Sequence, residues 1–526
     1  MSSTFATYIP TRLEMGALFP PMSPLTAIAI LLIIVPLLYV VILIRPSGPM
    51  RVLPGPRAVS WLTGSVPRGI WEPDAQVNQL EWTRQYGPVF RYHGLFMISK
   101  VITTDPQALN YILTSPEFVK SEDGRQYLER LLGKGVLVVE GLKHKKQGPA
   151  FGHPQIKVYS QLFVEKANEF RDLLMTQIAR SCTPDGSLKV DIFLWLNKVT
   201  LDIIGHTGFS YAFRSLQQDE PHEISEGLRK ATIFDPFDVR FMAEALIPPA
   251  RLIPSDRSRA VTNALKSLRS IGQRMISQKK SEILAAIEND DKSGVEKRNI
   301  IGRDLLSILL RANMAKDIPE DARMTDEEVL AQIPTFLLAG HETTSTATVW
   351  AIYALGCHPT AYAKLAKEAR GFYTDSPSMD ELNGMTYLDY VAREVLRLHA
   401  PVSNTDRMAT QDVVVPLNLK SLWGEDANEF KPERWEAIPE SAKVIPGLFG
   451  NLLTFITGSH GCIGYRFALV EMKAILFAFV RAFDFELAVP PSEITRRTMI
   501  VARPFLSSGP QNMPQLPLVI RPARSE

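Results

Sequence analysis

Residues 455–471, FITGSHGCIGYRFALVE, set one cysteine, Cys462, among glycines immediately before a long apolar segment. The apolar segment predicts a helix over residues 463–482, so Cys462 lies at a helix N-terminus, whose partial positive charge favours a thiolate. Glycines such as Gly464 lack a Cβ, which lets a flat ligand approach the backbone closely. This arrangement suits a thiolate bound to iron. The alternative is an inert cysteine of the core, because most free cysteines are simply buried side chains.

The composition is that of an ordinary globular protein, with 45% hydrophobic and 22% charged residues in a chain of 526. It excludes a mainly disordered, collagen-like or polytopic membrane protein. The 58 Lys and Arg against 56 Asp and Glu give a formal net charge of +2, so no overall basic field favours a nucleic-acid partner. The three cysteines, Cys182, Cys357 and Cys462, are too scattered for a disulfide framework and indicate a reducing environment.

A transmembrane anchor is predicted over residues 25–44, a stretch of 20 residues without a charge. This length spans the hydrocarbon core of a bilayer. The alternative is a cleaved signal peptide, but the apolar region of such a peptide normally covers only about 7–15 residues. Arg45, Arg51 and Arg57 follow the stretch, and the positive-inside tendency then places the rest of the chain in the cytosol.

The sequence divides into four parts around this anchor. They are an N-terminal segment (1–24), the anchor (25–44), a linker (45–57) and one large domain (58–526). The linker, RPSGPMRVLPGPR, holds four prolines and two glycines, which prevent a helix and favour a stiff, extended spacer.

The large domain is predicted to be mainly α-helical with a small β portion. Apolar residues recur at three- and four-residue spacing over residues 159–178, 258–288, 325–355, 389–399 and 463–482. The clearest strand signals are short, at residues 89–92 and 97–103, and strands and helices do not alternate as in a doubly wound sheet.

Several well-known catalytic signatures are absent. His341 and Glu342 begin like the HExxH of zinc proteases, but Ser345 stands where the second histidine is required. The chain also contains no GxSxG elbow, no GxxxxGK[ST] phosphate loop and no CxxCH heme-attachment motif. Hydrolase and nucleoside-triphosphatase functions therefore have no supporting motif.

Four motifs in a fixed order resemble those of the cytochrome P-450 family. Residues 455–464 match the family's cysteine-ligand pattern FxxGxRxCxG except at His460. Upstream stand AGHETT (339–344), the Glu394-x-x-Arg397 pair and FKPERW (430–435). Glu-x-x-Arg occurs six times in the chain, so only its place between the other motifs selects Glu394 and Arg397. LPGP (53–56) and YGPVF (86–90) also resemble the hinge and first-strand entry of membrane-bound members.

The resemblance implies an α+β cytochrome P-450 fold that binds heme, an iron protoporphyrin with Cys462 as its axial thiolate and metal ligand. It further implies that Phe455 and Gly464 belong to the ligand loop. The heme propionates would be contacted by His144, Arg407 and His460.

Two further groups of residues acquire roles from the same resemblance. Ala339 and Gly340 would leave room for dioxygen, while Glu342 and Thr343 would deliver protons by general acid catalysis; alternatively, Gly340 merely permits a close helix crossing. A buried network that holds the cysteine loop would consist of Glu394, Arg397 and Arg434. Its alternative is a surface ion pair contributing under about 1 kcal/mol.

The implied activity is a monooxygenase that inserts one oxygen atom of O2 into a small hydrophobic substrate. A thiolate on heme iron donates electron density that favours cleavage of the O–O bond. The implied partners are an NADPH-dependent cytochrome P-450 reductase and membrane lipid, with no nucleic acid. The expected location is the endoplasmic reticulum membrane, with a cytosolic catalytic domain.

Departures from the family pattern leave two alternatives open. His460 replaces an arginine, about four residues including another arginine are missing before Pro149, and residues 408–422 replace a longer connection that contains strands. Pro334 also interrupts the threonine-rich helix, at a cost of about 3 kcal/mol or a kink. The chain could therefore be a heme-binding but impaired relative, or an anchored scaffold without activity.

Overall fold

The computed structural model describes most of the large domain. The described residues are 52–67, 75–141, 152–181, 183–219, 222–232, 255–288, 304–314, 323–417, 422–498, 500–510 and 513–524, with isolated residues 23, 30, 34, 50, 144 and 253. The predicted anchor, residues 25–44, lies outside them except for Ile30 and Ile34. Among the described residues, no helix has both the length and the apolarity needed to cross a membrane.

The chain divides into two compact units. The first comprises Met1–Pro67 and Trp82–Ile102, and the second comprises Arg68–Glu81 and Thr103–Glu526. The first unit contains the strand pair β1 (Val89–His93) and β2 (Ser99–Thr103). Both predicted strands are present, but the second starts two residues late because η3 (Leu95–Met97) forms a 3-10 turn.

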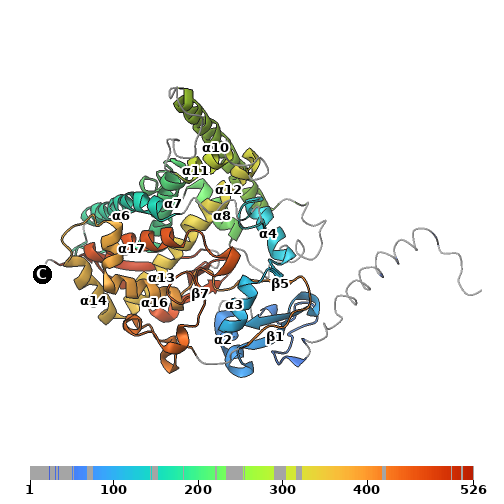
Figure 1. Cartoon of the computed structure of the whole chain (residues 1–526). Coiled ribbons are helices and arrows are strands. Elements are labelled where there is room, and N and C mark those ends of the chain that lie inside the picture. The colour runs from blue at the N-terminus through green and yellow to red at the C-terminus, as the bar shows by residue number, and fades with distance from the viewer. Residues whose placement is uncertain are drawn as a thin grey trace, which may run out of the picture. The chain divides into compact units, whose positions relative to one another are not determined.

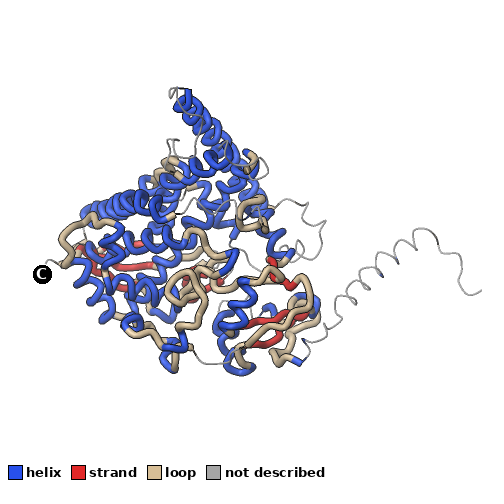
Figure 2. Tube along the Cα trace, in the orientation of Figure 1, coloured by secondary structure: helices blue, strands red, loops and turns tan. Residues whose placement is uncertain are grey.

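The second unit is built mainly of helices (Figures 1 and 2). With α2 (Ala75–Tyr86), which spans the boundary between the units, the α-helices are α3 (Pro106–Thr114), α4 (Glu122–Leu132), α6 (His153–Ser181), α7 (Ile192–Phe209), α8 (Glu223–Thr232), α10 (Asp256–Glu288), α11 (Leu305–Met314), α12 (Asp326–Leu337), α13 (Thr343–Cys357), α14 (Pro359–Arg370), α15 (Met379–Gly384), α16 (Thr386–Leu398) and α17 (Tyr465–Ala482). All five predicted helices are confirmed, although residues 325–355 form three consecutive helical segments.

The core is centred on α17, the helix that begins three residues after Cys462. This helix packs against α6, α13, α14 and α16 (Figure 1). Phe163 of α6 meets Phe467 of α17 edge to face at 4.7 Å between ring centroids, and both rings are buried. Burying an aromatic ring of this size contributes roughly 1.5–3 kcal/mol. The packing therefore fixes the helix start that carries the cysteine loop.

Short antiparallel strands complete the second unit. β4 (Leu188–Asp191) and β6 (Phe483–Leu487) flank β9 (Pro517–Pro522), with Leu188 and Phe485 both opposite Ile520. β7 (Ile494–Thr498) pairs with β8 (Ala502–Leu506), and β3 (Phe118–Val119) pairs with β5 (Met408–Ala409). Within residues 410–417, which the structure describes, no strand follows β5. The predicted α+β class is confirmed, and within the described residues 408–417 the connection after Arg407 contributes this two-residue strand alone to a sheet.

Candidate heme site

The cysteine loop is held in place by backbone hydrogen bonds and by a turn that requires glycine. Cys462 N–H donates to Phe455 O at 2.9 Å, and Gly461 N–H donates to Gly458 O at 3.1 Å. Gly458 has φ +73°, and a Cβ there would lie 2.1 Å from the carbonyl oxygen of Leu113 in α3. Only glycine satisfies both conditions. The loop is therefore pressed against α3, and Cys462 is left at the entrance to α17.

Cys462 is exposed to solvent where the loop enters α17. Burial by the surrounding protein nevertheless raises the pKa of its thiol, against a lowering by the backbone N–H of Gly464. An exposed cysteine bordered by glycines, at the start of a helix, fits an iron-bound thiolate.

Basic groups from separate segments converge beside this loop. His460 Nε2 lies 2.6 Å from Glu140 Oε2, and the His144 ring lies 5.0 Å from the His460 ring between centroids. Lys120 donates from Nζ to Leu137 O at 2.7 Å, and its backbone N–H donates to Glu140 Oε1 at 3.4 Å. The family resemblance points to His144 and His460 but gives no sign of Lys120.

Electrostatics show that Arg407 belongs to the same cluster. Burial lowers the pKa of Lys120 to about 8, and the charge of Arg407 adds to this lowering. Burial likewise lowers the pKa of His144 to about 4, with further lowering by His460 and Lys120. Burial also lowers the pKa of Arg407. Lys120 and Arg407 are partly buried cations close to two carboxylates, Glu140 and Asp406. Such cations can also pair with added anions, and the two heme propionates are anions of this kind.

Glu394 is the centre of a buried charge network, as the order of the motifs indicates. It is fully buried, and both of its oxygens accept hydrogen bonds from Arg397 at 2.8 Å. Arg434 Nε lies 3.4 Å from Glu394 Oε1 and its Nη1 lies 2.6 Å from Asp426 Oδ1. Burial excludes the alternative of a surface ion pair. Loss of one partner from such a network costs roughly 3–5 kcal/mol, because a buried charge is left uncompensated.

The threonine-rich helix changes its winding at the predicted oxygen site. α12 starts with a capping box formed by Thr325 and Glu328. Four residues after Pro334 the chain forms a π-helical turn, η8 (Leu338–Glu342), before α13 begins at Thr343. Single π-turns of this kind are frequent at functional sites. The proline is therefore accommodated within the helix rather than ending it.

Of the residues predicted for oxygen and proton handling, Ala339, Gly340 and Glu342 lie on this turn. Thr343 is the first residue of α13, and its partner differs from that of Glu342. A Cβ on Gly340 would lie 2.8 Å from the Ile204 side chain of α7, so this glycine does permit a close helix crossing. Thr343 Oγ1 donates to Ala339 O at 2.6 Å. Glu342 instead pairs with Arg503, a residue that no sequence motif singles out. Among the described residues, no hydrogen bond joins Glu342 to Thr343.

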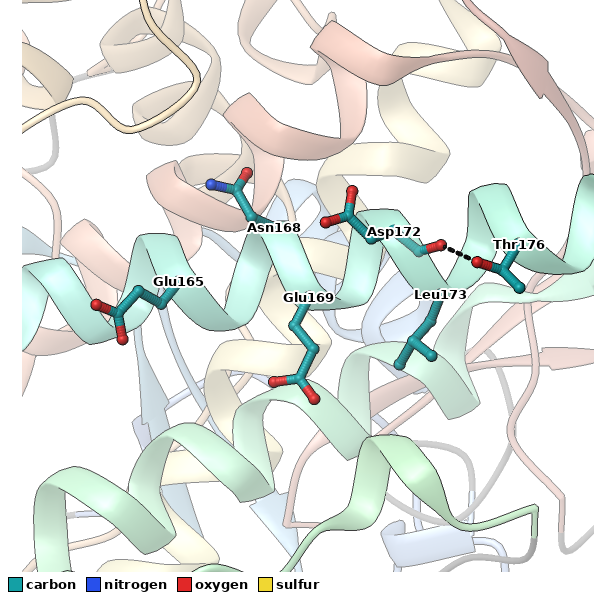
Figure 3. Close-up of a pocket in the computed structure, with 6 residues that line it drawn as sticks. All are labelled: Glu165, Asn168, Glu169, Asp172, Leu173 and Thr176. Atoms are coloured by element: carbon teal, nitrogen blue, oxygen red, sulfur yellow. Dashed lines mark hydrogen bonds between the residues drawn. The ribbon is translucent and has the colours of Figure 1, made fainter.

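Two surface cavities lie elsewhere. One, of about 490 Å³, is lined by the α6 residues shown in Figure 3, namely Glu165, Asn168, Glu169, Asp172, Leu173 and Thr176. The other, of about 450 Å³, is lined by His358, Leu398, His399, Asn428, Glu429 and Phe430. Neither contains a residue of the cysteine loop or of the π-turn, so we exclude both as the heme site.

Comparisons with known proteins agree with this geometry. The family model described as Cytochrome P450 matches residues 54–417 and 417–506, with its break in the short connection after Arg407. Cytochrome P450 monooxygenase 205 of Postia placenta (strain ATCC 44394 / Madison 698-R) is 42% identical, over 90% of this chain and 93% of its own length. Cytochrome P450 monooxygenase 128 of the same fungus is 40% identical, over 91% and 94%.

A more distant relative has the same overall extent. Cytochrome P450 monooxygenase claW of Ampulloclitocybe clavipes is 28% identical, over 91% of this chain and 94% of its own length. Family match and relatives together cover nearly all of the large domain. The chain therefore belongs to the cytochrome P450 family, is an oxygen-incorporating oxidoreductase and uses heme as its cofactor.

Proposed function

We propose that this protein is a heme-thiolate monooxygenase in which Cys462 is the axial ligand of the heme iron. The observation that carries this proposal is the exposed Cys462 at the start of α17, in a loop that requires glycine at position 458. When bound, heme with a thiolate ligand supplies the chemistry that favours O–O bond cleavage. The chain's own residues then bind the cofactor, hold the substrate and supply protons.

The basic cluster is proposed to bind the two propionates. Lys120, His144, Arg407 and His460 lie close to Glu140, and Asp406 is a second carboxylate near Lys120 and Arg407. Charge-assisted hydrogen bonds to carboxylates are roughly twice as strong as neutral ones, so Lys120 and Arg407 contribute most. The loop is also tied to α16, the helix that carries Glu394, because Thr454, next to Phe455, donates to Leu396 O of α16 at 2.8 Å.

Protons are proposed to reach the reacting oxygen through the Thr343 hydroxyl, with Glu342 as the acid behind it. Thr343→Ala should divert electrons from product to hydrogen peroxide, because a proton donor is lost while heme binding is retained. Peroxide and product formed per NADPH consumed would measure this. Thr348→Ala is the matched control, since Thr348 lies on the same helix and donates only to Thr344 O. Unaltered coupling in Thr343→Ala would count against the relay.

The redox partner and location are also proposals. We infer a small hydrophobic substrate, electrons from an NADPH-dependent cytochrome P-450 reductase, and a single-pass anchor in the endoplasmic reticulum membrane. The anchor and its orientation are supported by the uncharged stretch at residues 25–44 and by the arginines that follow it. A chain lacking residues 1–57 should leave the membrane fraction yet keep its heme. If the chain lacking residues 1–57 stays on membranes after alkaline extraction, the proposed anchor is contradicted.

A second candidate is a relative that binds heme but turns over poorly. The observation favouring it is the short connection after Arg407, where the family match breaks and no strand follows β5 within residues 410–417. Reductase-supported oxygen consumption distinguishes the two functions. Heme-loaded protein that consumes no oxygen with any substrate of a lipid, terpenoid and aromatic panel would favour the impaired relative. A preparation that never binds heme would favour the other alternative, an anchored scaffold without activity.

A further inference from the structure

An arginine on β8 is buried against the acid of the π-turn. Arg503 is 2% exposed, Glu342 is 3% exposed, and Thr232, the last residue of α8, is fully buried. Arg503 Nη2 forms an ion pair with Glu342 Oε2 and donates to Thr232 Oγ1 at 2.8 Å. One guanidinium nitrogen thus joins three segments that are far apart in the sequence.

The backbone around Arg503 is tied to the same helix that carries the proton-delivering residues. Trp350 of α13 donates from Nε1 to Ala502 O at 2.7 Å, one residue before Arg503. Ala502 N–H donates in turn to Pro401 O at 2.8 Å. β8 therefore cannot slide along α13 without breaking buried hydrogen bonds. This fixes the origin of the Arg503 side chain relative to Glu342.

The charges around Glu342 leave Arg503 as its compensating cation. His341, the adjacent ring, uses Nδ1 on Leu337 O at 2.7 Å, and burial lowers its pKa, so it remains neutral. Arg497, opposite Arg503 in the β7–β8 register, lies over the Phe505 ring at 5.0 Å. A carboxylate buried without a cation is strongly disfavoured. Among the described residues, Arg503 is therefore the cation that compensates the Glu342 carboxylate.

We propose that Arg503 is a positioning residue for the oxidation reaction: it holds Glu342 as an oriented carboxylate and, through Thr232, couples that orientation to the end of α8. The proposal rests on the proposed function, because it assumes that Glu342 supplies protons. In this arrangement Glu342 is directed to Arg503, while Thr343 donates to Ala339 O. Arg503 thus sets how readily the Glu342 carboxyl reaches the Thr343 hydroxyl.

The test compares four full-length variants: Arg503→Met, Arg503→Lys, Thr232→Val, and Arg503→Met combined with Glu342→Gln. Infrared difference spectra across a pH titration report the C=O stretch of a protonated carboxyl and need no turnover. Arg503→Met should gain a buried carboxylic-acid band near neutral pH that is absent from the unsubstituted protein. Arg503→Lys should lack the band, because it restores the cation. The double variant should lack it because the acid is gone.

Coupling provides the second readout. The pH profile of product formed per NADPH should move to higher pH by about one unit or more in Arg503→Met and return in Arg503→Lys. Thr232→Val keeps the ion pair, so it should leave the infrared spectrum unchanged but alter coupling. An unchanged infrared spectrum in Arg503→Met would overturn the proposal, and so would an unmoved pH profile.

Folding failure of the single variant is also informative. If Arg503→Met loses its heme or precipitates, the double variant should recover, because neither buried charge then remains. If the double variant does not recover, the ion pair between Arg503 and Glu342 is contradicted. If the unsubstituted protein itself binds no heme or shows no turnover, the proposed function is refuted instead. The infrared spectra of the variants can still be compared in that case.

Discussion

At position 460 a histidine stands where the cytochrome P450 pattern has an arginine. Burial lowers the pKa of His460, and Lys120 lowers it further, against the raising effect of Glu140. A histidine whose pKa is below its ordinary value of about 6.5 is mostly neutral at neutral pH. It therefore offers a propionate a weaker hydrogen bond than arginine would.

We predict that His460→Arg retains heme more tightly. A charge-assisted hydrogen bond contributes roughly 1.5–3 kcal/mol, so heme loss should slow by about tenfold or more. Transfer of heme to a scavenging apoprotein measures the rate. His153→Arg, at an exposed position at the start of α6, is the control and should change nothing. The advantage of arginine should shrink as the pH falls, since His460 then gains its own charge. Equal rates of heme loss at neutral pH would dismiss the role assigned to position 460.

The cysteine loop depends on Gly458 for its close contact with α3. Gly458→Ala should lower both stability and heme content, because the new Cβ meets a backbone carbonyl of α3 and the φ of +73° is unfavourable. Gly186 also has a positive φ, +63°, but a Cβ there would meet nothing within 4 Å. Gly186→Ala should thus cost only about 1 kcal/mol with full heme content. Urea unfolding and heme stoichiometry compare the two. Similar losses in both variants would mean that the contact with α3 is unimportant.

Local sequence predicts the amphipathic helices and the capped start of α12, because those signals lie within a few turns. It does not predict α7, whose residues are buried on nearly every side, so that no polar face marks a helical period. It also misses the π-turn after Pro334, since a proline in a helix can equally produce a kink or an end.

Contacts between distant segments are the least predictable part of the site. The family motifs identify Cys462 and the Glu394 network from sequence alone. Lys120 and Arg503 carry no motif, and each reaches the site only through folding of the whole second unit. A charged residue in a sequence gives no sign of whether it is buried. Only the packed fold shows which charges need partners.

For the molecule as a whole, acid should weaken the fold through buried neutral histidines. The His399 ring stacks on Trp350 at 5.0 Å between centroids, and burial, with the charges of Arg496 and Arg397, lowers its pKa to about 3. In the unfolded chain the pKa of His399 is about 6.5, so below that pH the unfolded chain binds a proton that the folded protein does not. The associated stability is therefore fully present above about pH 6.5 and is lost as the pH falls towards 3.

His399→Phe should reduce this acid sensitivity while keeping the ring stack. One proton bound only by the unfolded state changes the free energy of unfolding by up to about 1.4 kcal/mol per pH unit. Between about pH 7 and about pH 5, the unsubstituted protein should therefore lose roughly 2 kcal/mol more than the variant. Urea unfolding at each pH measures this, with the exposed His153→Phe as control. Parallel stability curves for His399→Phe and the unsubstituted protein would show that His399 is not buried in its neutral form.

The most direct measurement is the difference spectrum of the reduced protein with carbon monoxide. We predict the red-shifted Soret band of thiolate ligation in the unsubstituted protein and in Cys357→Ala, whose cysteine lies at the end of α13. Cys462→Ala should lack that band. A red-shifted band that survives in Cys462→Ala, or one that disappears in Cys357→Ala, would contradict the assignment of Cys462 as the iron ligand.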